Sequence, residues 1–353
     1  MSAVETSELR PGYRISRLIR GGWQLAGGHG DVAREEAVAD LVAAAEAGIL
    51  TFDCADIYTG VEELIGAARR AYADRHGAEA LKALKIHTKF VPDLATLNEV
   101  DRIYVRTIIE RSLRRLGQEC LDLVQYHWWD YSVPGCIDAA LWLEELRREG
   151  KIHLIGGTNF DTPHTEKLVA AGVPLVSMQV QYSLLDARAE NAMVAAARKH
   201  DIHLLVYGTV AGGFLGESWL GQPEPAAPLE NRSLTKYKLI IDDFGGWNLF
   251  QELLRALRRI ADRHGVDIAT VASRYTLDQP QVAAVIVGAR NRAHLGANLK
   301  IATLKLTEAD RTEIGAVLAR RQGPEGDTFD LERDRDGRHG RIMKYNLSRS
   351  PAA

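Results

Sequence analysis

The stretch REEAVADLVAAAEAGILTFDCA (residues 34–55) joins an amphipathic helical pattern to a short apolar strand pattern. The same alternation of strand and helix runs through the chain and is typical of βα units that build a parallel sheet. The candidate strands are residues 17–24, 50–55, 84–90, 121–127, 152–157, 175–181, 203–208 and 282–288. Eight strands, each followed by a helix, predict a (β/α)8 TIM barrel of the α/β class. A doubly wound sheet is disfavoured because no candidate strand leads into a GxGxxG turn.

Two segments depart from this alternation. Residues 209–246 are predicted to form a long loop after the seventh strand, and a loop of this length is expected to serve as a lid or clamp. Residues 323–353 are polar and lack periodicity, so they form either a disordered tail or a segment that folds back on the barrel. The apolar residues available to anchor such a segment are Phe329, Ile342, Met343 and Tyr345. We therefore expect a barrel over residues 9–322 and a C-terminal extension over residues 323–353.

Composition narrows the class of protein. The chain has 353 residues, of which 46% are hydrophobic and 26% charged, and this excludes a disordered, collagen-like or disulfide-rich protein. The 44 Lys and Arg residues against 47 Asp and Glu residues give a net charge of −3, which argues against a nucleic-acid or anionic-membrane partner. The three cysteines show no CxxC spacing, and the first residues lack the apolar run of a signal peptide. We expect a cytoplasmic protein. A homo-oligomer is possible, and the sequence leaves the oligomeric state open.

Polar residues at the predicted strand ends form a chemically coherent set. Active sites of such barrels lie at the C-terminal ends of the strands, where this chain has Asp53, Lys89 and His127, with Tyr58 five residues after Asp53 in the following loop. A tyrosine has a pKa of about 10, and a nearby cation favours its phenolate. Lys89 is the candidate cation, Asp53 would hold its ammonium, and His127 would donate a hydrogen bond to a substrate carbonyl. The alternative for Asp53 and Lys89 is a purely structural ion pair.

Three tryptophans follow the first and fourth predicted strands, at positions Trp23, Trp128 and Trp129. Large flat side chains at a barrel rim predict an apolar substrate pocket, and rim packing is the alternative. Neighbouring residues on a strand point to opposite faces, so Trp128 and Trp129 are not expected to line the same wall. No metal site is expected, because no second ligand lies at zinc spacing beside His127.

Five stretches resemble the aldo-keto reductase family, in that family's order. They are AGILTFDCADIYTGVEELIG (47–66), SLRRLGQECLDLVQYHWWD (112–130), GKIHLIGGTNF (150–160), QVQYSLLD (179–186) and VIVGARNRAHLGANL (285–299). The resemblance extends from about residue 17 to residue 322. It implies a (β/α)8 oxidoreductase that binds a nicotinamide cofactor without a Rossmann fold and exchanges hydride with an aldehyde or ketone.

The resemblance also implies roles for single residues. Tyr58 would be the general acid, tuned by Asp53 and Lys89, and His127 would orient the carbonyl. The cofactor would be held by Thr158, Asn159, Gln179, Tyr207, Gly288, Arg290, His294 and Asn298. In that set Asn159 and Gln179 would bind the carboxamide, and Tyr207 would stack on the nicotinamide ring. Arg290 is the expected partner of a 2′-phosphate, which favours NADP(H) over NAD(H).

Two further function classes are alternatives to a carbonyl reductase. Some relatives of this family are cofactor-bound regulatory subunits of potassium channels with little turnover, but no partner-binding surface is evident in the sequence. A glycoside hydrolase needs two carboxylates at the strand ends, and only Asp53 is placed there, with Asp186 further along in a loop. The expected partner is therefore a small carbonyl or alcohol substrate.

Overall fold

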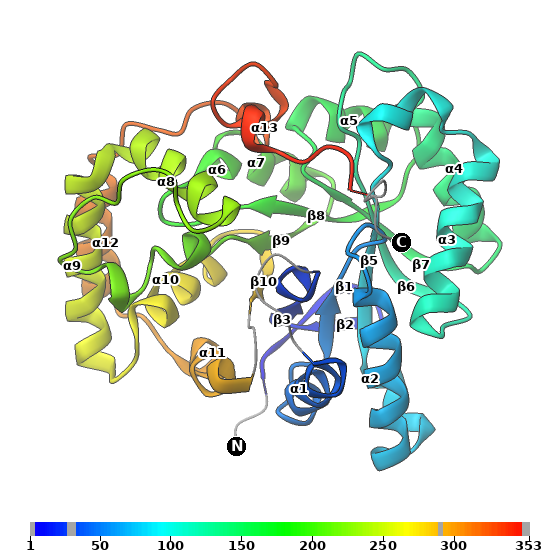
Figure 1. The fold of residues 1–353 in the computed structure, drawn as a ribbon, viewed down its shortest axis with the longest axis horizontal. Helices are drawn as coiled ribbons and strands as arrows, with labels where there is room; N and C mark the ends of the chain where they lie inside the picture. Colours follow the sequence, from blue (N-terminus) through cyan, green and yellow to red (C-terminus); the bar gives the residue numbers. More distant parts are fainter. Residues whose placement is uncertain (1–3, 27–32, 289–291, 348–353) are drawn as a thin grey trace.

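The computed structural model describes residues 4–26, 33–288 and 292–347. Its centre is a closed barrel of eight parallel strands in the order β10-β3-β4-β5-β6-β7-β8-β9 (Figure 1). The strands are β3 (Leu18–Gly21), β4 (Thr51–Asp53), β5 (Lys85–Phe90), β6 (Leu121–Tyr126), β7 (Ile152–Thr158), β8 (Leu175–Gln181), β9 (His203–Tyr207) and β10 (Val282–Val287). Each strand lies where the sequence predicts one, so the (β/α)8 prediction is confirmed.

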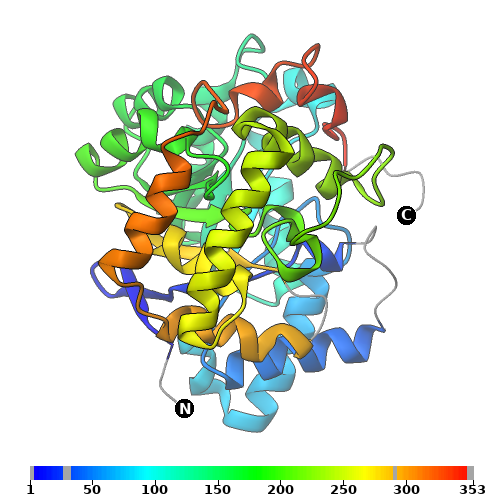
Figure 2. The same ribbon diagram turned by 90° about the vertical axis from the view of Figure 1, so that its left-hand side faces the viewer.

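Helices surround the barrel and bury their apolar faces against it. They are α1 (Arg34–Glu46), α2 (Val61–His76), α3 (Arg102–Leu116), α4 (Cys136–Arg148), α5 (Thr162–Ala170), α6 (Arg188–Asn191), α7 (Met193–Lys199), α9 (Gly246–His264), α10 (Ile268–Leu277), α11 (Leu295–Thr303) and α12 (Glu308–Leu318). Figure 2 looks onto α9 and α12, which pack side by side. In the part of the chain that the structure describes, no helix has the length and apolarity needed to cross a membrane.

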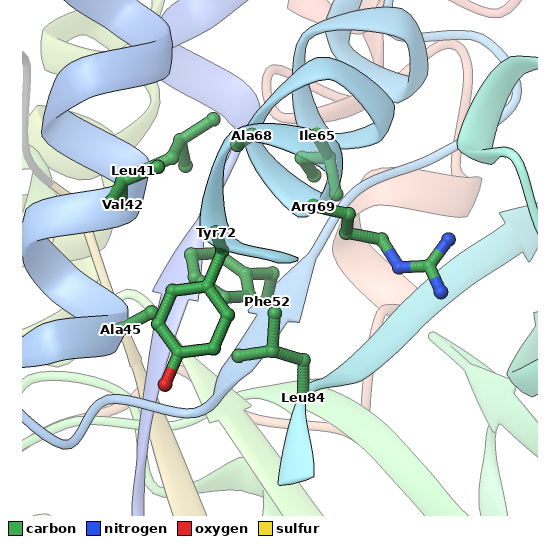
Figure 3. Close-up of a pocket in the computed structure, with 9 residues that line it drawn as sticks. All are labelled: Leu41, Val42, Ala45, Phe52, Ile65, Ala68, Arg69, Tyr72 and Leu84. Carbon is green, nitrogen blue, oxygen red and sulfur yellow. The ribbon is translucent and has the colours of Figure 1, made fainter. Parts of the chain in front are cut away.

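The layer between helices and strands is tightly filled. Between α1, α2 and β4 the apolar side chains of Leu41, Phe52 and Ile65 leave a cavity of about 10 Å³ (Figure 3). A space of this size holds one water molecule at most. It is therefore a packing gap and not a ligand site.

A hairpin that the sequence did not predict covers the N-terminal end of the barrel. It consists of β1 (Thr6–Arg10) and β2 (Tyr13–Ser16). Its buried residues Leu9, Tyr13 and Ile15 pack in one apolar cluster with Ile19, Leu123, Val176, Leu205, Ala283 and Ala284 from the barrel. This end of the barrel is therefore filled mainly with apolar side chains, and the Tyr13 hydroxyl forms a buried polar contact there with His87 Nε2 at 3.3 Å.

The prediction of a continuous loop over residues 209–246 is wrong. The segment contains helix α8 (Arg232–Phe244), whose first turn is capped by the Asn231 side chain accepting from the backbone N–H of Leu234. The buried residues Tyr237, Ile240, Ile241 and Phe244 of α8 belong to the same apolar cluster as α9. Two short 3-10 turns lie in the connection between β9 and α8.

The C-terminal extension folds back over the barrel through residue 347, the last one described. It contains α13 (Asp330–Arg333) and a 3-10 turn (Gly340–Ile342), and Figure 1 shows it in red at the side of α6 and α7. Phe329 is 4% exposed, and the Tyr345 hydroxyl lies 2.9 Å from the Glu332 carbonyl oxygen. The backbone N–H of Leu94 donates to the Tyr345 carbonyl. Of the two alternatives, folding back on the barrel is confirmed for these residues, with Ile342 and Met343 half-buried.

Candidate active site

Alternation along the strands directs polar side chains into the carboxyl end of the barrel. On β6, Val124 and Tyr126 pack between the strands and the surrounding helices, while Leu123 faces the barrel interior. With a period of two residues, Gln125 and His127 share the inward face of Leu123. The interior is thus mainly apolar near the N-terminal hairpin, with the buried Tyr13–His87 contact as an exception, and polar at the opposite end.

Asp53 is the centre of the polar end. Its Oδ2 accepts from Lys89 Nζ at 2.7 Å, and its Oδ1 accepts from Gln125 Nε2 at 2.9 Å and Gln179 Nε2 at 2.7 Å. Lys89 Nζ also donates to the Cys54 carbonyl at 2.8 Å. The expected contact between Asp53 and Lys89 is therefore present, and both side chains are buried.

Gln125 is a member of this network that the sequence analysis missed. It lies two residues before His127 and therefore on the same face of β6. The alternation of side chains along a strand could have identified it. Gln179 donates a second hydrogen bond, to Gln125 Oε1 at 2.9 Å. Both hydrogens of the Gln179 amide are thus donated within the network. Only the Gln179 side-chain oxygen is left to bind the carboxamide of a nicotinamide, as an acceptor.

Tyr58 lies beside the buried ion pair. The Lys89 ammonium is 5.1 Å from the centroid of the Tyr58 ring, and the phenol is partly exposed. Burial raises the pKa of Tyr58, Lys89 lowers it by less, and the pKa lies above its ordinary value. Lys89 thus acts on the Tyr58 pKa in the expected direction, but burial outweighs it. Burial lowers the pKa of Lys89, but Asp53 and Tyr58 outweigh burial, so the pKa is raised and the ammonium persists.

His127 has a defined tautomer. Its Nδ1 lies 2.9 Å from the Thr158 carbonyl oxygen, which can only accept, so Nδ1 carries the proton. Burial, followed by the charge of Arg333, lowers the pKa of His127 to about 3. In a neutral ring with its proton on Nδ1, Nε2 is an acceptor, and it is buried without a partner in the described structure. The expected donation from His127 to a substrate carbonyl is inconsistent with this tautomer.

The three tryptophans have different places. Trp23 is 40% exposed and packs edge-on to Tyr58, with 5.0 Å between ring centroids. Trp129 packs against His127, with 4.3 Å between centroids. Trp128 is fully buried in the core, and its Nε1 donates to the Val133 carbonyl. The prediction of Trp128 as a pocket residue is therefore wrong, because it shares the outward face of Tyr126.

The candidate cofactor residues form two groups. Thr158, Asn159 and Tyr207 lie at the ends of β7 and β9, where the Tyr207 hydroxyl donates to Asn159 Oδ1 at 2.8 Å. Gly288, His294 and Asn298 lie on the connection from β10 into α11, with Gly288 and His294 exposed and Asn298 half-buried. Arg290 lies outside the described residues. Over the ranges described, no three His, Cys, Asp or Glu side chains gather as a metal site.

The chemistry of the first group suits a nicotinamide. That ligand is a flat aromatic ring with a carboxamide, which needs both hydrogen-bond donors and acceptors. The Tyr207 ring, the Asn159 amide and the oxygen of Gln179 offer these functions at the ends of adjacent strands. The residues present therefore fit the cofactor that the sequence resemblance implies.

Comparison with known proteins is consistent with this geometry. The model of the "Aldo/keto reductase family" matches residues 17–319. The chain belongs to the aldo-keto reductase family. It is 28% identical over 320 residues to "Aldo-keto reductase YhdN" of Bacillus subtilis (strain 168), covering 89% of this chain and 93% of that protein. The "NADH-specific methylglyoxal reductase" of Escherichia coli (strain K12) is 24% identical over 313 residues, with coverage of 84% and 93%.

A solved structure is similar as well. The thermostable aldo-keto reductase Tm1743, solved with the inhibitor epalrestat, superposes with a TM-score of 0.70 at 26% identity. The match covers 89% of this chain and 99% of that one. Fold and family together identify the chain as an oxidoreductase of the aldo-keto reductase family.

The network around Asp53 leads to a stability prediction. Asp53→Asn leaves the Lys89 ammonium buried without its anion, and breaking a buried pair in this way is expected to lower the free energy of unfolding by about 3–5 kcal/mol. The double variant Asp53→Asn with Lys89→Met removes the unpaired charge, so we expect it to be more stable than the single variant. Urea unfolding of the parent and both variants measures this. Equal losses in the two variants would show that charge burial is not the cause.

Proposed function

We propose that the protein catalyses reversible hydride transfer between a nicotinamide cofactor and the carbonyl carbon of an aldehyde or ketone. The observation that carries this proposal is the Tyr58 phenol beside the buried Lys89–Asp53 pair, at the carboxyl end of a barrel of this family. When bound, the reduced nicotinamide supplies the hydride. Asn159, Gln179 and Tyr207 are the residues that would hold its ring and carboxamide.

Tyr58 acts as the proton donor in carbonyl reduction. Its raised pKa keeps the phenol protonated at neutral pH. As the proton moves to the carbonyl oxygen, the developing phenolate is stabilised by the Lys89 ammonium, whose position is set by Asp53 and the Cys54 carbonyl. Partial exposure of Tyr58 lets the phenolate regain a proton from solvent.

His127 acts as a fixed acceptor beside the reacting oxygen. The Thr158 carbonyl holds the proton on Nδ1, so Nε2 is available to accept from the hydroxyl of the alcohol product. Trp23 and Trp129 flank Tyr58 and His127 and provide flat apolar walls. These walls favour a substrate that carries an apolar or aromatic group next to its carbonyl.

We infer a preference for NADP(H). The connection from β10 to α11 carries the cationic side chains of Arg290 and Arg292 and the exposed His294. Charged guanidinium groups bind phosphate with short, strong hydrogen bonds. The naming of one relative as NADH-specific makes cofactor choice a property to measure on this chain.

Replacing Tyr58 tests the proton donor. Tyr58→Phe removes the hydroxyl and keeps the ring beside Trp23, so we expect carbonyl reduction to fall by about 10²- to 10⁴-fold while cofactor binding is retained. Turnover is followed by loss of reduced-nicotinamide absorbance with a panel of aldehydes and ketones, and binding by quenching of protein fluorescence. Tyr72→Phe, on the outer helix α2, is the matched control and should keep parental rates. A Tyr58→Phe variant as active as the parent would refute the mechanism.

The pH dependence of the two directions follows from the Tyr58 pKa. Reduction needs the phenol and oxidation needs the phenolate, and the pKa of Tyr58 is raised by burial. We therefore expect kcat/KM for reduction to be flat through neutral pH and to fall only above about pH 10, while alcohol oxidation rises with pH. Lys89→Met should move both limbs to higher pH, because Lys89 lowers this pKa. If kcat/KM for reduction already declines as the pH is raised from neutral to 8, this assignment is contradicted.

Cofactor preference is tested on Arg290. We expect the parent to have a lower KM for NADPH than for NADH, and Arg290→Ala to raise the NADPH value by roughly 10- to 100-fold, the loss expected for a charged hydrogen bond. The KM for NADH should stay unchanged, since NADH lacks the 2′-phosphate. A parent that uses both cofactors with equal KM would overturn the inference.

A further inference from the structure

The C-terminal extension places one guanidinium on the backbone of the candidate active site. Arg333 Nη1 donates to the carbonyl oxygens of Trp128 at 2.5 Å and Trp129 at 2.6 Å, and Nη2 donates to that of Asn159 at 2.7 Å. These carbonyls follow β6 and β7, beyond the last hydrogen bonds of the sheet. Partly buried carbonyls without a ladder partner gain from another donor, and the planar fork of an arginine can serve several at once.

Both segments that orient His127 are attached to this guanidinium. Trp129 packs on the imidazole, and the Thr158 carbonyl, next to Asn159 in the chain, accepts from His127 Nδ1. Asn159 has a φ of 59°, in the left-handed region that asparagine enters more readily than most residues. The Arg333 hydrogen bond to the Asn159 carbonyl is one contact that fixes this conformation. Through these bonds it sets the direction of the chain at His127 and Asn159 together.

Arg333 itself is held firmly. Its guanidinium carbon lies 3.9 Å from the centroid of the Tyr131 ring, a cation–π contact. The preceding residue, Glu332, is fully buried and accepts from Arg188 at 2.9 and 3.1 Å, with Lys236 at 3.6 Å. Burial raises the pKa of Glu332, but Arg188 and Lys236 outweigh it and bring the pKa to about 2, so this anchor is ionised at neutral pH.

We propose that Arg333 is a positioning residue of the active site, which holds the ends of β6 and β7 so that His127 and Asn159 face the reacting groups. This inference rests on the function proposed above for those two residues. The C-terminal extension then has a direct role in the geometry of the site. Because Arg333 also places a positive charge near His127, it helps to keep that imidazole neutral.

The test compares substitutions at Arg333 with a control on the same segment. Arg333→Met removes the three hydrogen bonds, and we expect kcat/KM for carbonyl reduction to fall about 10- to 100-fold, chiefly in kcat, since misorientation in the site costs rate. Arg333→Lys keeps the charge without the fork and should lie between Met and the parent. Arg335→Met, an exposed neighbour paired with Asp130, is the control and should stay within twofold of the parent.

Two readouts separate positioning from general damage to the fold. Nitrogen-15 NMR of the histidine rings should show His127 neutral and protonated on Nδ1 in the parent at mildly acidic pH, and Arg333→Met should raise its pKa and mix its tautomers. Guanidinium ion at low concentration should restore turnover to Arg333→Gly, and sodium ion should not. Parental rates in Arg333→Met, or a loss of rate with an unchanged His127 signal and no rescue, would overturn the proposal. A parent without any carbonyl turnover would reject the proposed function, while the His127 signal would still decide the role of Arg333.

Discussion

The buried contact between Lys89 and Asp53 is the constraint on which the site depends. Neither side chain is more than 6% exposed, and an unpaired charge at such a depth would be strongly destabilising. The pair is tolerated because Gln125 of β6 and Gln179 of β8 donate hydrogen bonds to the Asp53 carboxylate. The Cys54 carbonyl accepts a further hydrogen bond from the Lys89 ammonium. The same network connects four strands of the barrel and places a permanent cation beside Tyr58, so stability of the barrel end and chemistry of the phenol share one arrangement.

The two ends of the barrel are closed in different ways. The N-terminal hairpin fills one end mainly with apolar side chains, which contribute by burial, and its Tyr13 hydroxyl contacts the buried His87. The C-terminal extension crosses the other end and contacts it through hydrogen bonds and ion pairs, from Arg188 after β8 to Leu94 after β5. Polar anchoring suits this end because the carbonyls beyond the strands must be satisfied. An extension held in this way becomes part of the wall around His127.

Reading alternate residues along a strand explains both what was predicted and what was missed. The same period of two that selects His127 also selects Gln125 and Trp129 and assigns Trp128 to the outer layer. The electrostatics of Tyr58 and His127 were less predictable, because their pKa values depend first on burial and then on neighbouring charges. Proximity of Lys89 and Tyr58 could be inferred from strand order. The net direction of the Tyr58 pKa could not.

Local periodicity in the sequence was sufficient to predict the barrel, and the residues near successive strand ends gave the candidate set Asp53, Tyr58, Lys89 and His127. The path of the C-terminal extension, the tautomer of His127 and the contacts of Arg333 follow from long-range packing and could not be predicted. The reason is separation along the chain. Arg333 meets the Trp128 carbonyl across 205 positions, and a polar segment without periodicity contains no local signal of the partner that will satisfy it.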